Sequence, residues 1–117
     1  MKVTLLPRKE FELRLHDNVI KGQFGTWALK RFCDLRGYSL TDVSKAFTGE
    51  KAFDDMIIFL LCAVEYKCRL NNEDFSFTDV HVCEWIDEMG GIDSAEFAGL
   101  FNHANSEDSK KKVAKGK

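Results

Sequence analysis

The run Met56-Ile57-Ile58-Phe59-Leu60-Leu61-Cys62-Ala63-Val64 is the longest unbroken apolar stretch in the chain. It is too short to cross a bilayer, which takes about 20 apolar residues. A helix through this run is apolar on all sides, and such a helix is normally buried. We therefore expect a central buried helix from about Lys51 to Leu70, with the rest of the domain packed around it.

The first twenty residues alternate between apolar and polar side chains, which is typical of half-buried strands. The apolar positions are Val3 and Leu5 in one run, and Phe11, Leu13 and Leu15 in the next. Pro7 lies between the runs, where its missing N–H removes no strand pairing. The pattern predicts a small N-terminal β-hairpin.

Beyond the hairpin, helical periodicity and capping residues predict four helices in addition to the central one. They are Thr26 to Gly37, Ser39 to Gly49, Asp79 to Met89 after a cap at Thr78, and Ala95 to about Ala104 after a cap at Asp93 or Ser94. The expected fold class is α+β and mostly α-helical, with a small N-terminal β-hairpin followed by about five helices, the central one of which is buried.

The 117 residues have room for one globular domain, which we place at residues 1–105. Residues 106–117 hold five Lys against two acidic residues and are expected to form a flexible basic tail. Without this tail the body has 12 basic and 17 acidic residues, a net charge of -5. An acidic body argues against nucleic-acid binding, and the chain lacks the features of a signal peptide, so we expect a cytoplasmic protein.

Metal and catalytic chemistry find little support in the sequence. The cysteines at 33, 62, 68 and 83 form no Cys-x-x-Cys pair, so we expect small buried residues rather than zinc ligands or disulfides. His81 and Cys83 are the closest pair of soft ligands, but they diverge by about 200° on a helix. No nucleophile elbow, phosphate loop or His-Glu-x-x-His motif is present. We expect no catalytic residue, no metal and no cofactor.

The adjacent carboxylates of the predicted helices also give no sign of a catalytic pair. Asp54 with Asp55, and Asp87 with Glu88, splay apart on a helix and are expected to lie on solvated faces.

The spacing of Cys33, Gly37 and Val43 fits a helix-turn-helix. The second helix would carry only Asp42 and Lys45 as long polar groups, whereas phosphate contacts need several Lys or Arg. An ordinary helix–helix turn is the favoured interpretation, and a DNA-binding regulator is a weaker alternative.

Aromatic and apolar residues gather toward both ends of the helical body. They are Phe24, Trp27, Trp85, Phe97, Leu100 and Phe101. A domain of this size has much surface for its volume, so some of these side chains are expected to form an interface for a partner helix or a second copy. The competing interpretation places all of them in the core.

Two segments carry a family resemblance that spans roughly residues 10 to 102. One runs from Phe24-Gly25-Thr26-Trp27 through Gly37-Tyr38-Ser39-Leu40, and the other from Phe77-Thr78-Asp79-Val80 to Trp85-Ile86-Asp87-Glu88. Together with Phe59 to Tyr66, they resemble the small, short-frame tail assembly chaperones of long-tailed bacteriophages.

This resemblance implies a non-enzymatic protein of the host cytoplasm that binds and solubilises the tape measure protein and is absent from the mature virion. The tail tube protein and a second copy of the chain are further implied partners, and neither nucleic acid nor membrane is. The alternative within the same setting is a helical structural or adaptor protein of the phage particle.

Overall fold

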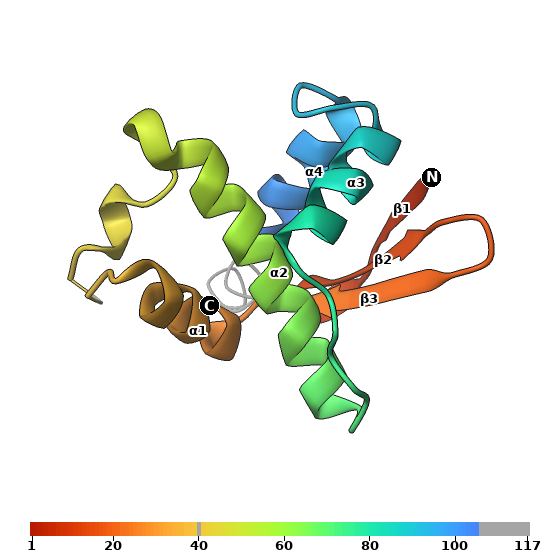
Figure 1. The fold of residues 1–117 in the computed structure, drawn as a ribbon, viewed down its shortest axis with the longest axis horizontal. Coiled ribbons are helices and arrows are strands. Elements are labelled where there is room, and N and C mark those ends of the chain that lie inside the picture. Colours follow the sequence, from red (N-terminus) through yellow and green to blue (C-terminus); the bar gives the residue numbers. More distant parts are fainter. Residues whose placement is uncertain (40, 106–117) are drawn as a thin grey trace, which may run out of the picture.

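The computed structural model describes residues 1–39 and 41–105, which form an α+β fold that is mostly helical (Figure 1). The strands are β1 (Lys2–Leu5), β2 (Glu10–Arg14) and β3 (Val19–Gln23); the α-helices are α1 (Thr26–Arg36), α2 (Ala52–Leu70), α3 (Asp79–Met89) and α4 (Ala95–Ala104). Single 3-10 turns lie at Pro7–Lys9, Val43–Lys45 and Gly49–Lys51. The predicted fold class is therefore confirmed, and the predicted tail at residues 106–117 lies outside the described residues.

Helix α2 is the buried centre of the fold, as its apolar run predicts. It contacts β3, α1 and α3, and Figure 1 shows it crossing the middle of the molecule. Leu60, Cys62, Ala63 and Val64 have no exposed surface. None of the helices in the described ranges has a stretch apolar and long enough to span a bilayer.

The predicted hairpin is part of a larger sheet. β1 pairs with β2, and β2 pairs with β3, both antiparallel, so β3 is a strand that the alternation rule did not find. The inward positions of β3 are Ile20 and Gly22, and glycine adds no apolar signal. Gly22 faces Phe11 across the sheet, and a Cβ there would lie 2.1 Å from the Phe11 ring. The glycine thus makes room for a buried ring.

The segment between α1 and α2 differs from the prediction of a helix over Ser39 to Gly49. Ala46 is extended, and Phe47 has a left-handed φ of 69°, so the helix cannot continue through them. Among the described residues between α1 and α2, only the turns at Val43–Lys45 and Gly49–Lys51 are helical. The second helix of a helix-turn-helix is therefore missing here.

Most helix ends follow the predicted capping residues. Gly37 ends α1 at φ 76°, Ser94 Oγ accepts the Phe97 N–H at the start of α4, and Thr78 forms a capping box with His81 at the start of α3. Thr26 is the exception: Gly25 holds the cap position, and Thr26 is the first helical residue.

Candidate partner-binding surfaces

Four of the six predicted interface residues lie in the core. Phe24, Trp85, Phe97 and Leu100 are each at most 4% exposed, so in this fold they offer almost no surface to a partner. Trp27 and Phe101 are half-buried. The competing interpretation, that the aromatic residues fill the core, is therefore correct for most of the set.

Continuous packing of rings explains this burial. Phe24 lies 5.0 Å from Phe11 and 5.2 Å from Phe59 between ring centroids, and Phe97 lies 5.1 Å from Phe101. Phe101 also contacts the rings of Phe24 and Phe59, so most of its contacts are within the core. Of the six predicted interface residues, this leaves Trp27 as the one whose ring contacts lie at the surface.

Trp27 belongs to a surface cluster formed by the start of α1 and the end of α2. Its ring stacks on Tyr66 at a centroid distance of 5.7 Å and an interplanar angle of 18°, and the Arg69 guanidinium lies 5.5 Å from the Trp27 centroid. Leu70, which is 52% exposed, follows Tyr66 by one helical turn. We call Trp27, Tyr66, Arg69 and Leu70 the tryptophan patch.

A buried carboxylate holds the arginine of the tryptophan patch in place. Glu65 is only 5% exposed, and both of its carboxylate oxygens are hydrogen-bonded. Arg31 Nε donates to Oε1 over 3.1 Å, and Arg69 Nη2 donates to Oε2 over 2.9 Å. Because Glu65 fixes Arg69, the guanidinium is positioned over Trp27 before any partner arrives. The spacing of Glu65 and Arg69 on α2 was a sequence signal for this pair.

Asp55 corrects the expectation that the adjacent carboxylates are all solvated. Its side chain is fully buried, whereas Asp54, Asp87 and Glu88 are exposed. Arg36 Nε donates to Oδ1 of Asp55 over 2.8 Å.

Two further donors complete the Asp55 site. The Tyr38 hydroxyl donates to Oδ2 over 2.9 Å and the Phe47 N–H donates to the same oxygen over 3.1 Å. Burial alone raises the pKa of Asp55, but these hydrogen bonds and the Arg36 charge outweigh it and hold the pKa below its ordinary value. Asp55 thereby ties the segment between α1 and α2 to both helices.

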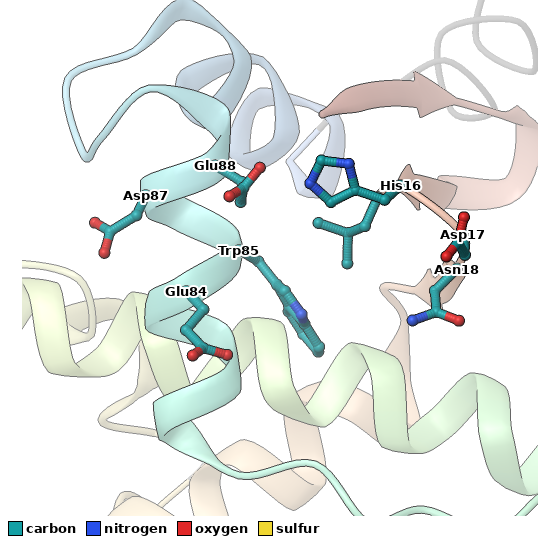
Figure 2. A pocket seen from close by; sticks show the side chains of 8 residues that line it. His16, Asp17, Asn18, Glu84, Trp85, Asp87 and Glu88 are labelled. Atoms are coloured by element: carbon teal, nitrogen blue, oxygen red, sulfur yellow. The ribbon is translucent and has the colours of Figure 1, made fainter.

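A cleft of about 490 Å³ opens between the β2–β3 turn and α3 (Figure 2). Its lining residues are Leu15, His16, Asp17 and Asn18 from the turn, and Glu84, Trp85, Asp87 and Glu88 from α3. The lining therefore combines four carboxylates with one indole ring. Figure 2 shows the Trp85 ring between the helix and the turn.

The cysteines match the sequence expectation at three positions of four. Cys33, Cys62 and Cys68 are buried, while Cys83 is exposed on α3, which corrects the prediction for that residue. Burial raises the pKa of the Cys62 thiol to about 12, and burial followed by the nearby Asp79 and Asp87 raises the pKa of Cys83. Among residues 1–39 and 41–105, no group of three or more His, Cys, Asp or Glu side chains could hold a metal ion.

Comparison of the chain with family models, with characterised proteins and with solved structures gives no match. Function is therefore inferred from the chain's own residues and from the resemblance of their pattern.

Proposed function

We propose that this protein is a non-enzymatic tail assembly chaperone that binds and solubilises the tape measure protein in the host cytoplasm and leaves before the virion is complete. The observation that carries the proposal is the tryptophan patch. The family resemblance supplies the identity of the client, and the patch supplies a surface suited to an apolar helix.

The composition of the tryptophan patch favours protein binding. Trp, Tyr and Arg are the residue types most enriched among interface hot spots, and Trp27, Tyr66 and Arg69 bring one of each into contact. Glu65 already orders Arg69, so binding loses less side-chain entropy than it would with a free arginine. The exposed Leu70 extends the apolar area along α2.

A chaperone for a long client needs contacts that are individually weak and repeated. Several copies bound along one helical client would raise the total affinity without a large interface on each copy. The tryptophan patch has the chemistry for such a contact, because it combines two stacked rings and a cation with a nearby exposed leucine.

Co-expression with the candidate tape measure protein tests the proposal. The client should be found in the soluble fraction with the wild-type chain and in the pellet without it. Trp27→Ala should weaken binding by about 30-fold, which corresponds to about 2 kcal/mol for a truncated hot-spot residue. Val80→Ala is the matched control, because Val80 is a 64% exposed apolar residue outside the patch.

The outcomes separate the chaperone from its rivals. A client that partitions identically with and without this protein contradicts the proposal. Recovery of the chain in purified particles would support the adaptor alternative instead, and salt-dependent binding of DNA would support a regulator.

A further inference from the structure

Strand β3 is one edge of the three-stranded sheet, since the strand order is β1-β2-β3 (Figure 1). At the turn between β2 and β3, Leu15 and Asn18 exchange both of their backbone hydrogen bonds. Pairs of this kind alternate along an antiparallel ladder, so Ile20 and Gly22 bond to β2. The residues that alternate with them direct their N–H and C=O groups away from β2. They are Val19, Lys21 and Gln23.

The outer edge of β3 has no backbone partner among residues 1–39 and 41–105. None of the turn and loop hydrogen bonds of these residues involves the backbone of Val19, Lys21 or Gln23. The extended segment at residues 74–77, which lies between α2 and α3, also forms no backbone hydrogen bond in that set. An unpaired strand edge is a ready template for another strand, because its N–H and C=O groups point outward in a row.

A cavity of about 370 Å³ lies along this edge. Three successive residues of β3, Val19, Ile20 and Lys21, line it, although their side chains alternate between the two faces of the sheet. A cavity that touches all three lies beside the strand rather than over one face. The other lining residues come from α2 and from the segment between α2 and α3. They are Val64, Cys68, Glu73, Asp74 and Phe77.

The cavity lining has an apolar part and a charged part. The apolar part consists of the buried Ile20, Val64 and Cys68 and the half-buried Phe77. Lys21 lies on the strand, whereas Glu73 and Asp74 lie on the segment across the cavity, and all three are exposed. None of these three charges forms an ion pair within the described part of the chain. A ligand between them therefore meets a cation on one side and two carboxylates on the other.

We propose that β3 binds an extended segment of a partner protein as a fourth, antiparallel strand, with an apolar side chain of that segment in the cavity between an acidic and a basic residue. Main-chain hydrogen bonds to the β3 edge supply affinity, and the cavity selects the alternate side chain. This binding uses β3 and is separate from the tryptophan patch, so it does not depend on the chaperone function.

The order of the three residues follows from the directions of the β3 side chains. Residues directly opposite each other in an antiparallel pair have their side chains on the same face. The apolar residue lies opposite Ile20, whose side chain points inward, and its two neighbours lie opposite Lys21 and Val19. An acidic residue opposite Lys21 forms a cross-strand ion pair, whereas a basic one is repelled. The basic residue opposite Val19 then extends its ammonium group toward Glu73 and Asp74.

A synthetic peptide of this pattern, acetyl-Thr-Glu-Val-Lys-Thr-amide, is the probe, and the ¹⁵N-labelled full-length chain is the sample. In the free protein the outward N–H groups of Val19, Lys21 and Gln23 should exchange with D₂O faster than those of Ile20 and Gly22. Adding the peptide up to about 5 mM, which detects millimolar affinity, should slow the exchange of the outward groups and shift their NMR signals.

Two matched comparisons isolate the edge hydrogen bonds. N-methylation of the glutamate in the peptide removes the N–H that donates to the Lys21 carbonyl and should weaken binding at least about 5-fold. In the protein, Lys21→Pro removes an outward N–H and leaves the pairing with β2 intact, whereas Lys21→Gln removes the same charge and keeps the N–H. The proline variant should bind the peptide at least about 5-fold more weakly than the glutamine variant.

Circular dichroism shows whether Lys21→Pro is folded, and if it is not, the N-methylated peptide decides on its own. Unchanged exchange of the outward N–H groups at about 5 mM peptide would overturn the proposal. Equal binding of the peptide and its N-methylated form would do the same. Slowed exchange confined to Val3 and Leu5 would place the peptide at β1, the other edge of the sheet, and would also overturn it.

Discussion

Replacing Asp55 by Asn should destabilise the protein by about 3 kcal/mol, because it removes the negative charge and one of the two acceptor oxygens of a buried network. The wild-type carboxylate is fully buried and accepts from Arg36, Tyr38 and Phe47. Asn keeps the size of the side chain but replaces one carboxylate oxygen by an NH₂ group. That group is a donor facing donors, so at least one of the three partners loses its hydrogen bond.

The magnitude follows from how much of the network stays buried. Breaking a buried ion pair costs about 3–5 kcal/mol when the remaining charge has no water, and a hydrogen bond to a charged group contributes about 1.5–3 kcal/mol. The Arg36 side chain is 23% exposed, so water can partly solvate its guanidinium after the substitution. This places the expected loss at the lower end of the range.

The effect should depend on pH in a direction set by the carboxylate. The pKa of Asp55 is lowered in the folded state, since its hydrogen bonds and Arg36 outweigh the effect of burial. In the unfolded chain an Asp has a pKa of about 3.9. The stabilisation is therefore complete above about pH 4 and is lost as the pH falls through the folded-state value. The free-energy difference between wild type and Asp55→Asn should shrink over that acidic window.

Urea unfolding followed by circular dichroism measures this difference at each pH. Asp54→Asn is the matched control, because Asp54 is the exposed neighbour on the same helix and should change stability by less than about 0.5 kcal/mol. If Asp55→Asn lost less than about 1 kcal/mol at neutral pH, or if its deficit did not shrink in acid, the network would not be the stabilising contact described above.

Three further results are expected. Leu60→Ala should lower the free energy of unfolding by about 2–5 kcal/mol, whereas Leu70→Ala, at a 52% exposed position, should change it by less than about 0.5 kcal/mol; equal effects in urea titrations would contradict the central position of α2. Gly22→Ala should cost at least about 1–3 kcal/mol in the same assay, since its Cβ would collide with the buried Phe11 ring, and a neutral result would refute that packing. Iodoacetamide should modify Cys83 alone in the native protein and all four thiols after unfolding, as counted by mass spectrometry; modification of a second thiol in the native state would contradict the described burial.

The elements that could be predicted are those with a local sequence signal. The apolar run of α2 predicted that this helix is buried. Ser94 and Thr78 predicted the starts of α4 and α3, because capping depends on residues three positions apart. Strand β3 was not predicted, because its inward position Gly22 is not apolar. A glycine is needed there to leave room for the Phe11 ring of the neighbouring strand. The alternation of apolar residues does not detect that role.

The features that could not be predicted depend on contacts between distant residues. The burial of Asp55 could not be predicted, because in the sequence it does not differ from other helical carboxylates. Its partners, Arg36 and Tyr38, which lies 17 residues earlier, contact it only in the fold. The same holds for the left-handed Phe47, whose N–H is satisfied by Asp55. Trp27 was among the predicted interface residues, but its contact with Arg69 depends on α1 and α2 lying side by side.

The central claim is that the tryptophan patch binds the client, and suppression of client aggregation tests it most directly. Purified tape measure protein diluted out of denaturant should scatter light strongly on its own and weakly in the presence of the wild-type chain. Trp27→Ala should lose most of this protection at equal concentration, while Val80→Ala should keep it. Equal protection by wild type and both variants would contradict the claim, as would a wild-type chain that leaves the scattering unchanged.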